Sequence, residues 1–195
     1  MSTQKLLTFV QDITRLLNRN PAESEILVEG KKLVATLVSS DEWLPDAFAQ
    51  PHPDHYQQYL LYADPLDRLS IVSFVWGPGQ KTPVHDHLTW GIVGGLRGEE
   101  RETTFQKQAD GSYKPTGTGV LHAGETTAVS PVIGDIHEVS NNLTDRPSIS
   151  IHVYGKNIGR VHRHVFDPAT GAAKSFVSGY ANPEVVPNLW GGVAA

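Results

Sequence analysis

Residues 79–87 read Gly-Gln-Lys-Thr-Pro-Val-His-Asp-His. The glycine and proline give the start of this stretch turn chemistry, and the stretch ends on two histidines that are two residues apart. Side chains at positions i and i+2 of a strand point to the same face. His85 and His87 can therefore hold one metal ion, while Asp86 points away from it.

The composition is that of an ordinary globular protein. The chain has 195 residues, of which 39% are hydrophobic and 19% charged, and this length suits one domain. The net charge of −5 argues against a basic nucleic-acid-binding face. No apolar run approaches the roughly 20 residues that span a bilayer, and the N-terminus lacks the pattern of a signal peptide. We therefore expect a cytoplasmic protein with no nucleic-acid or membrane partner.

Cysteine is absent from the chain. This excludes disulfides, thiolate nucleophiles and metal sites built on sulfur ligands. Any metal must be held by nitrogen or oxygen, and the nine histidines are the natural candidates.

The first part of the chain has the pattern of two helices. Apolar residues at helical spacing predict one helix over residues 3–19, which Ser2 or Thr3 can cap, and a second from Pro21 to Val38. We expect both helices to pack on the outside of a sheet.

From residue 56 the pattern changes to short apolar or alternating runs separated by glycine and proline. The segments 108–112 and 167–171 read as hairpin turns. Closely spaced short strands without helices between them predict a barrel or sandwich. The candidate strands cover residues 56–62, 69–76, 84–87, 90–96, 99–107, 126–129, 136–140, 148–154 and 160–166. The expected organisation is a single domain over residues 1–195, with a helical segment (1–50), a β-barrel (56–178) and an irregular tail (179–195).

Two stretches resemble the motifs of the cupin superfamily. Residues 79–98 follow the pattern Gly-x5-His-x-His-x3-Gly-x6-Gly, in which cupins normally carry a glutamate at the position of Gly91. Residues 134–141, Gly-Asp-Ile-His-x3-Asn, resemble the core of the second motif, which supplies His137 as a third ligand. The resemblance implies a mainly β fold, the double-stranded β-helix or small antiparallel jelly-roll barrel, with the metal inside its mouth.

The glycine at position 91 changes the chemistry that the motif implies. Three histidines without a carboxylate leave about three positions on a divalent metal, enough for a chelating substrate and dioxygen together. Neutral imidazoles also leave the site more positive, which favours an anionic thiolate. Glu99 and Glu100 follow the motif, and we expect them to point away or to form salt bridges.

A third motif narrows the family. Ser150, His152 and Tyr154 alternate with aliphatic residues, so a strand sends all three to one face. Serine can orient one imidazole nitrogen, and the other nitrogen can hold the tyrosine hydroxyl. This arrangement resembles the Ser-His-Tyr triad of the cysteine dioxygenase type I family, and the similarity extends over roughly residues 56–165.

The chain departs from mammalian-type cysteine dioxygenases in two places. Those enzymes carry a cysteine, cross-linked to the triad tyrosine, at the position that aligns with Gly91, so Tyr154 is expected to be free here. They also carry a carboxylate-binding arginine two residues after a tyrosine. In this chain Gln58, after Tyr56, takes that position.

Both departures resemble the bacterial branch that includes 3-mercaptopropionate dioxygenases. In that branch a glutamine replaces the arginine, and another arginine, from after the triad strand, helps to bind the carboxylate. Arg163 fits this role best by its distance from Tyr154, and Arg160 is the second choice.

The resemblance implies an oxidoreductase that adds both atoms of O2 to the sulfur of a small carboxylated thiol, giving a sulfinic acid. It also implies one Fe(II) per chain; three histidines would bind zinc or nickel as well, so iron rests on the resemblance. The implied residues are His85, His87 and His137 for the metal, Ser150, His152 and Tyr154 for catalysis, and Tyr56, Gln58 and Arg163 for the substrate.

Several alternatives remain open from the sequence. The chain could be a cysteine dioxygenase proper, although Gln58 argues against it. It could also be a metal-dependent isomerase, or a cupin that binds a metal or ligand without turnover. A monomer and a small homo-oligomer are both compatible with the sequence.

Overall fold

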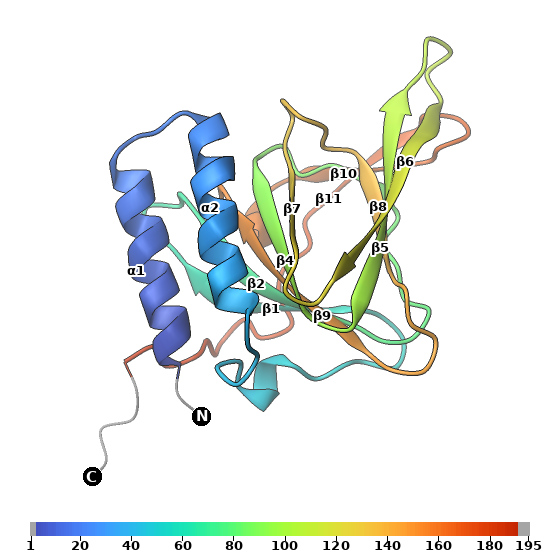
Figure 1. Cartoon of the computed structure of the whole chain (residues 1–195). Coiled ribbons are helices and arrows are strands. Elements are labelled where there is room, and N and C mark those ends of the chain that lie inside the picture. The colour runs from blue at the N-terminus through green and yellow to red at the C-terminus, as the bar shows by residue number, and fades with distance from the viewer. Residues whose placement is uncertain (1–2, 191–195) are drawn as a thin grey trace.

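The computed structural model describes residues 3–190 (Figure 1). This range contains two α-helices, two short 3-10 helices and eleven strands. The strands are β1 (Gln57–Ala63), β2 (Ser70–Trp76), β3 (Val84–His85), β4 (Gly91–Arg97), β5 (Glu99–Lys107), β6 (Tyr113–His122), β7 (Thr126–Val129), β8 (His137–Asn141), β9 (Ser148–Tyr154), β10 (Arg163–Phe166) and β11 (Ala173–Phe176).

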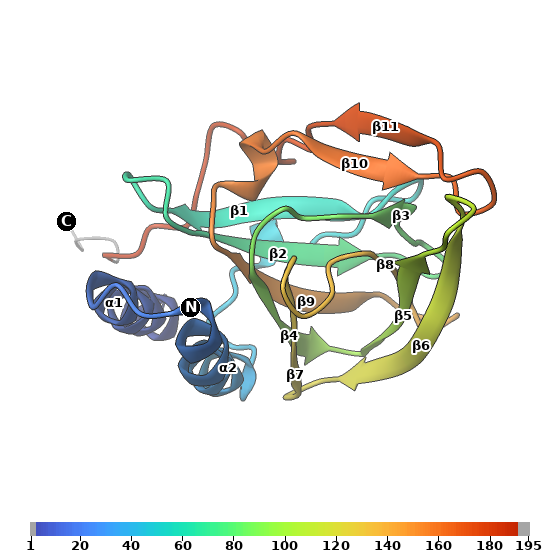
Figure 2. The ribbon, with the colours of Figure 1, turned by 90° about the horizontal axis from the view of Figure 1, so that it is seen from above.

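The strands form two antiparallel sheets that together enclose a barrel. One sheet has the order β1-β2-β9-β4-β7 and the other the order β11-β10-β3-β8-β5-β6. Seen from above, the strands surround a common interior and both helices lie outside it (Figure 2). The predicted mainly β barrel with external N-terminal helices is confirmed.

The helices α1 (Gln4–Asn18) and α2 (Glu23–Val38) lie side by side, and α2 covers the outer face of β4. A glycine makes this close packing possible. A Cβ atom at Gly94 of β4 would lie 2.6 Å from Cγ1 of Val34 and 2.8 Å from Cγ1 of Val38. The apolar faces of both helices merge with the outer face of the five-stranded sheet into one core.

The helix ends differ in detail from the prediction. Helix α2 begins at Glu23, so Pro21 precedes the helix instead of starting it. Thr3 occupies the N-cap position of α1, but its hydroxyl donates to the carbonyl of Asn188 at 2.6 Å and does not cap the helix. Ser2 lies outside the described residues. None of the helices in the described part is long and apolar enough to cross a membrane.

Strand β9 separates two cores. Its aliphatic residues Ile149, Ile151 and Val153 belong to the core beneath the helices. Tyr154 belongs instead to a second cluster in the barrel interior, with Val72, Phe74 and Trp76 of β2 among its members. The aliphatic residues of β9 therefore face the core outside the barrel, and the polar residues that alternate with them face the barrel interior.

Two strands were not predicted, β6 and β11. Both hairpin turns that lead into them were recognised, but the returning strands were not. They are the edge strands of the six-stranded sheet, largely exposed, and β6 carries a proline and two glycines. Edge strands lack the apolar alternation that marks a buried face.

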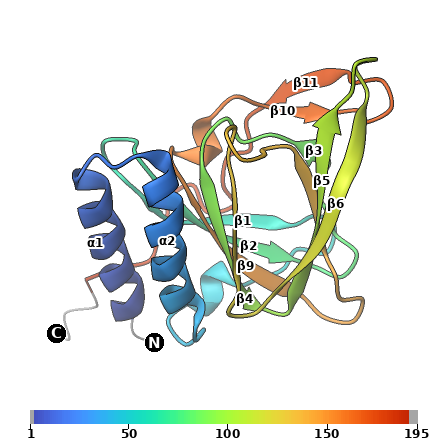
Figure 3. The same cartoon turned by 45° about the horizontal axis from the view of Figure 1, so that its top comes forward.

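Two predicted strands were too long. Strand β3 ends at His85, two residues short of the prediction. The segment predicted from residue 160 begins with a 3-10 helix, η2 (Ile158–Arg160), and β10 starts only at Arg163. Strands β10 and β11 lie on the side of the barrel away from the helices (Figure 3).

The chain after β11 returns along β1. The amide of Ala181 donates to the carbonyl of Gln58 at 2.8 Å, and the side chain of Asn182 bonds both the amide and the carbonyl of Leu60 at 2.7 and 2.9 Å. These contacts bring Tyr180 against the interior cluster. The C-terminal segment therefore closes one wall of the barrel.

Candidate active site

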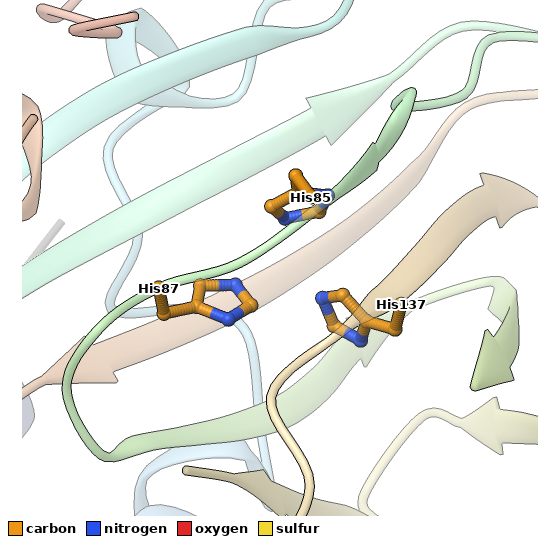
Figure 4. A group of neighbouring side chains, drawn as sticks. All are labelled: His85, His87 and His137. Atoms are coloured by element: carbon orange, nitrogen blue, oxygen red, sulfur yellow. The ribbon is translucent and has the colours of Figure 1, made fainter. Parts of the chain in front are cut away.

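Three buried histidines meet inside the barrel and point toward one another (Figure 4). His85 and His137 are direct partners where β3 pairs with β8. His87 lies beyond the end of β3, just before a residue with a positive φ of 58°, Leu88. The potential ligand atoms of the three histidines all lie within 4.8 Å of one another. The predicted grouping of these residues as a possible metal site is confirmed.

Hydrogen bonds fix the orientation of His85 and His87. Nδ1 of His85 is 3.0 Å from the carbonyl oxygen of Pro83, to which it can only donate. Nδ1 of His87 is 2.8 Å from Oδ1 of Asp135, which also accepts from the backbone amides of His87 and Leu88. Asp135 therefore holds His87 toward the centre although the strand has already ended.

His137 is oriented in the same way. Its Nδ1 lies 2.5 Å from Oε1 of Glu102 on the neighbouring strand β5. All three Nδ1 atoms are thus engaged, which leaves the three Nε2 atoms as metal ligands. This donor set fits a divalent metal, and no carboxylate of the described residues belongs to it.

Asp86, between the two motif histidines, points away from them as predicted. Its carboxylate accepts from the amide of His164 at 2.8 Å and bonds the ring of the same residue at 2.9 Å. These two hydrogen bonds hold the segment that contains His85 and His87 against β10.

The site keeps His85 and His87 in the neutral form that binds metals. Burial lowers the pKa of both His85 and His87 well below the ordinary value, and the neighbouring imidazoles lower it further. The positive charge of Arg163 acts in the same direction on both. These rings therefore do not need to lose a proton before a metal binds.

A cavity of about 240 Å³ adjoins the three histidines. Aromatic and aliphatic side chains form much of its wall. No aspartate or glutamate among the described residues lines it, whereas an arginine and a lysine do. Besides the histidines, the predicted residues that line it are Tyr56, Gln58, His152, Tyr154 and Arg163.

Two basic residues line this cavity, Arg163 and the more exposed Lys174 of β11. Arg163 is the buried one. It is only 4% exposed, it donates from Nη2 to the hydroxyl of Ser178 at 2.9 Å, and it lies over the ring of Phe176 at 4.7 Å. Its Nε has no hydrogen-bond partner within residues 3–190, and burial lowers its pKa. Arg160, the other candidate, lies exposed on η2.

Gln58 and Tyr56 form the wall on the β1 side. Oε1 of Gln58 is buried and, in the described part of the chain, has no hydrogen-bond partner. Tyr56 lies against Trp76, with ring centroids 4.8 Å apart, and burial raises its pKa. A buried polar atom without a partner is costly, so the amide of Gln58 is available to a ligand.

Ser150, His152 and Tyr154 form a hydrogen-bonded row along β9. The hydroxyl of Ser150 lies 2.8 Å from Nε2 of His152, and Nδ1 of His152 lies 2.8 Å from the hydroxyl of Tyr154. All three are buried. Burial lowers the pKa of His152 and raises that of Tyr154, so both are neutral.

Gly91 lies directly opposite Tyr154 in the pairing of β4 with β9. A Cβ at this position would be 3.0 Å from both Cδ1 and Cε1 of the Tyr154 ring. The tyrosine ring thus fills the space into which a side chain at position 91 would extend.

The positions of three acidic residues near the site were not predicted from the sequence. These residues are Glu100, Glu102 and Asp135. Glu102 and Asp135 orient metal-site histidines, as described above. Glu99 pairs with His122 at 3.0 Å as expected, but Glu100 does not point away: it is 4% exposed and lines a cavity together with Val139 and His152. Alternation along β5 could have placed Glu100 and Glu102 on one face, and Asp135 lies two residues before His137.

A small antiparallel barrel with three inward histidines has the architecture of a cupin metalloprotein. The model of the family described as cysteine dioxygenase type I matches residues 1–167. The chain belongs to this family, and it is accordingly an oxidoreductase of the dioxygenase class. The family is one of non-haem iron proteins, and His85, His87 and His137 form the possible iron site.

Individual relatives agree with the family match. Cysteine dioxygenase type 1 from Homo sapiens is 26% identical over 170 residues, covering 82% of this chain and 80% of the relative, and the Bos taurus protein gives the same figures. Among solved structures, a double-stranded beta-helix protein from Klebsiella pneumoniae is 15% identical and covers 70% of this chain and 97% of its own, with a TM-score of 0.46. A cupin superfamily protein from Desulfitobacterium hafniense is 14% identical and covers 60% of this chain and 95% of its own, with a TM-score of 0.43.

Proposed function

We propose that this protein oxidises a small carboxylated thiol of the 3-mercaptopropionate type with O2 to the sulfinic acid. One Fe(II) per chain would be held by Nε2 of His85, His87 and His137. The observation that carries this proposal is the cavity beside the histidines, which contains the buried Arg163 and, within the described residues, no acidic side chain. Such a cavity suits a ligand with a negative charge at each end.

The residues of the cavity would divide the work as follows. Bound iron would supply the redox chemistry that combines the thiol sulfur with dioxygen. Arg163 would bind the substrate carboxylate by a charge-assisted hydrogen bond, and the amide of Gln58 would add a neutral one. The hydroxyl of Tyr154 would orient the substrate, and the aromatic walls would exclude water.

The charges of the cavity favour a thiol without an amino group. The ammonium of cysteine would enter a cavity that already contains Arg163 and whose described lining residues offer no carboxylate. Burying a charge without a counter-charge is unfavourable. 3-Mercaptopropionate, which carries only a thiol and a carboxylate, avoids this cost.

Cysteine is the second candidate substrate, because the curated relatives are cysteine dioxygenases. The cysteine dioxygenases that this chain resembles carry a carboxylate-binding arginine at the position of Gln58, so that position separates the two candidates. We expect Gln58→Arg, despite its added positive charge, to change the ratio of kcat/KM for cysteine to kcat/KM for 3-mercaptopropionate in favour of cysteine by about tenfold, equivalent to about 1.4 kcal/mol.

Gln57→Arg is the matched control, since neighbouring residues of a strand point to opposite faces and Gln57 is not among the residues that line this cavity. It should leave the ratio unchanged. If Gln58→Arg also leaves the ratio unchanged, Gln58 does not face the carboxylate. If the unmodified protein already prefers cysteine, the proposed substrate is wrong.

A further inference from the structure

The guanidinium of Arg163 has few polar partners for a buried cation. Arg163 begins β10 and is only 4% exposed. In the described part of the chain its guanidinium makes a single hydrogen bond, from Nη2 to the hydroxyl of Ser178 at 2.9 Å. Its Nε is buried and has no partner within residues 3–190. A guanidinium has several N–H donors, so most of the hydrogen-bonding capacity of Arg163 is available to a ligand.

The hydrogen bond and a ring contact of this guanidinium both come from one short segment, residues 176–178. Cζ of Arg163 lies over the ring of Phe176, 4.7 Å from its centroid, and this contact limits the movement of the guanidinium toward that wall. The hydrogen bond to Ser178 limits its rotation. A planar guanidinium binds a carboxylate best when two of its N–H groups point at the two oxygens. These two contacts therefore decide how well Arg163 is aligned with a ligand.

Ser178 is itself held by backbone contacts on both sides. Before it in the chain, Phe176 pairs with Arg163, where β11 lies beside β10 (Figure 2). After it, Gly179 has a positive φ of 64°, a conformation that suits glycine. The amide of Gly179 donates to the carbonyl of Gly159 at 3.0 Å. The backbone therefore keeps the hydroxyl of Ser178 beside the guanidinium.

We propose that Ser178 is a positioning residue that holds the guanidinium of Arg163 in the orientation that binds the carboxylate of the thiol. Ser178 is not among the residues that line the cavity beside the histidines, so it acts on the substrate only through Arg163. It also lies beyond residue 167, where the match to the family model ends. The inference rests on the proposed function, in which Arg163 binds the substrate carboxylate.

Two thiols that differ only in the carboxylate test this role. 1-Propanethiol has a methyl group where 3-mercaptopropionate has its carboxylate. The dissociation constant of each is measured by calorimetry with full-length protein loaded with Zn(II), in the absence of oxygen, so that no turnover occurs. We expect Ser178→Ala to weaken the binding of 3-mercaptopropionate by about tenfold, as for the loss of one hydrogen bond to a charged group. The binding of 1-propanethiol should not change, whereas a general loss of structure would weaken both.

Two control variants isolate the hydroxyl of Ser178. Ser178→Thr keeps a hydroxyl at this position and should bind 3-mercaptopropionate as the unmodified protein does. Ser175→Ala removes a serine hydroxyl from β11, but its neighbours Lys174 and Phe176 line the cavity, so Ser175 points to the opposite face and its loss should have no effect. The proposal is overturned if either control binds 3-mercaptopropionate as weakly as Ser178→Ala, or if Ser178→Ala weakens the two thiols equally.

Arg163→Met separates this inference from the proposed function. It removes the charge, and it should weaken the binding of 3-mercaptopropionate at least as much as Ser178→Ala does. Adding Ser178→Ala to Arg163→Met should cause no further loss, because Ser178 acts through Arg163; a further tenfold loss would overturn the inference. If Arg163→Met weakens binding and Ser178→Ala does not, the inference alone fails. If Arg163→Met has no effect, the proposed carboxylate site fails, and the inference fails with it.

Turnover by the iron-loaded protein gives a second readout. A residue that only aligns the carboxylate-binding cation contributes equally to the binding of substrate and transition state, so its loss raises KM and leaves kcat unchanged. We expect Ser178→Ala to raise KM for 3-mercaptopropionate by about tenfold and to keep the kcat of the unmodified protein. A fall in kcat with unchanged KM would contradict a positioning role toward the carboxylate.

Discussion

His85, His87 and His137 present Nε2 to a common centre because a carbonyl, an aspartate and a glutamate hold their other ring nitrogens. Removing any one ligand leaves two, too few to retain iron against a chelator. We expect each His→Ala variant to lose nearly all bound iron, measured by elemental analysis after dialysis.

The surface histidine His122, which pairs with Glu99, provides the control for these variants. His122→Ala should retain the iron content of the unmodified protein. A ligand variant that keeps full iron occupancy would remove that residue from the ligand set.

Tyr154 lines the cavity beside the histidines, its hydroxyl bonds Nδ1 of His152, and its ring packs against Gly91 and His87. Tyr154→Phe removes the hydroxyl and keeps the ring, so the barrel and the iron should both be preserved. We expect kcat to fall by about 10- to 100-fold, or sulfinate formed per O2 consumed to decrease, as for the loss of one catalytic hydrogen bond. Unchanged kinetics and coupling would discard this role.

At the scale of residues, the motif spacing was sufficient to predict the three histidines and the row on β9. It was not sufficient to predict that Glu102 and Asp135 orient the ligands. Those contacts depend on the register of β5 against β8 and on the turn after β3, which a single sequence does not specify. The assigned roles in substrate binding and turnover stay predictions.

At the scale of elements, the contact of α2 with β4 depends on the absence of a side chain at Gly94. A valine at this position would force apart Val34 and Val38 of α2 and the strand. We expect Gly94→Val to lower the free energy of unfolding by about 1–3 kcal/mol, the usual cost of overpacking a core, measured by urea denaturation.

A compensating change tests the cause of this loss. Val34→Ala removes the methyl groups nearest to position 94 and should restore part of the stability of Gly94→Val, although alone it destabilises the core. If the losses of stability of the two single variants simply add in the double variant, the contact of position 94 with Val34 is not the cause of the loss in Gly94→Val.

Elements with a buried face were predicted from the sequence and those without one were not. The helices and the strands β2, β4 and β9 carry apolar residues that face a core, and their pattern revealed them. The edge strands β6 and β11 carry exposed polar residues. Pairing partners, not local pattern, place these two strands.

At the scale of the whole molecule, the buried Glu100 makes folding stability depend on pH. Its pKa is about 8 in the folded chain and 4.5 ordinarily, so between these values the folded state binds a proton that the unfolded state has released. The free energy of unfolding therefore falls as the pH rises across this window and is constant above it. The full effect is at most about 5 kcal/mol.

Glu100→Gln removes this dependence. We expect the variant to gain stability relative to the unmodified protein as the pH is raised from 5 to 8, measured by urea denaturation at several pH values. A difference between the two proteins that stays constant with pH would mean that Glu100 titrates normally in the folded state.

The central claim is the oxidation of a carboxylated thiol, and oxygen uptake tests it most directly. The Fe(II)-loaded protein is supplied in turn with 3-mercaptopropionate, cysteine and cysteamine, and the products are identified by mass with isotopically labelled dioxygen. The account predicts a sulfinic acid that contains both labelled oxygen atoms, formed with the highest kcat/KM from 3-mercaptopropionate and barely at all from cysteamine, which lacks a carboxylate. Absence of uptake with every thiol, in protein shown to contain iron, would contradict it.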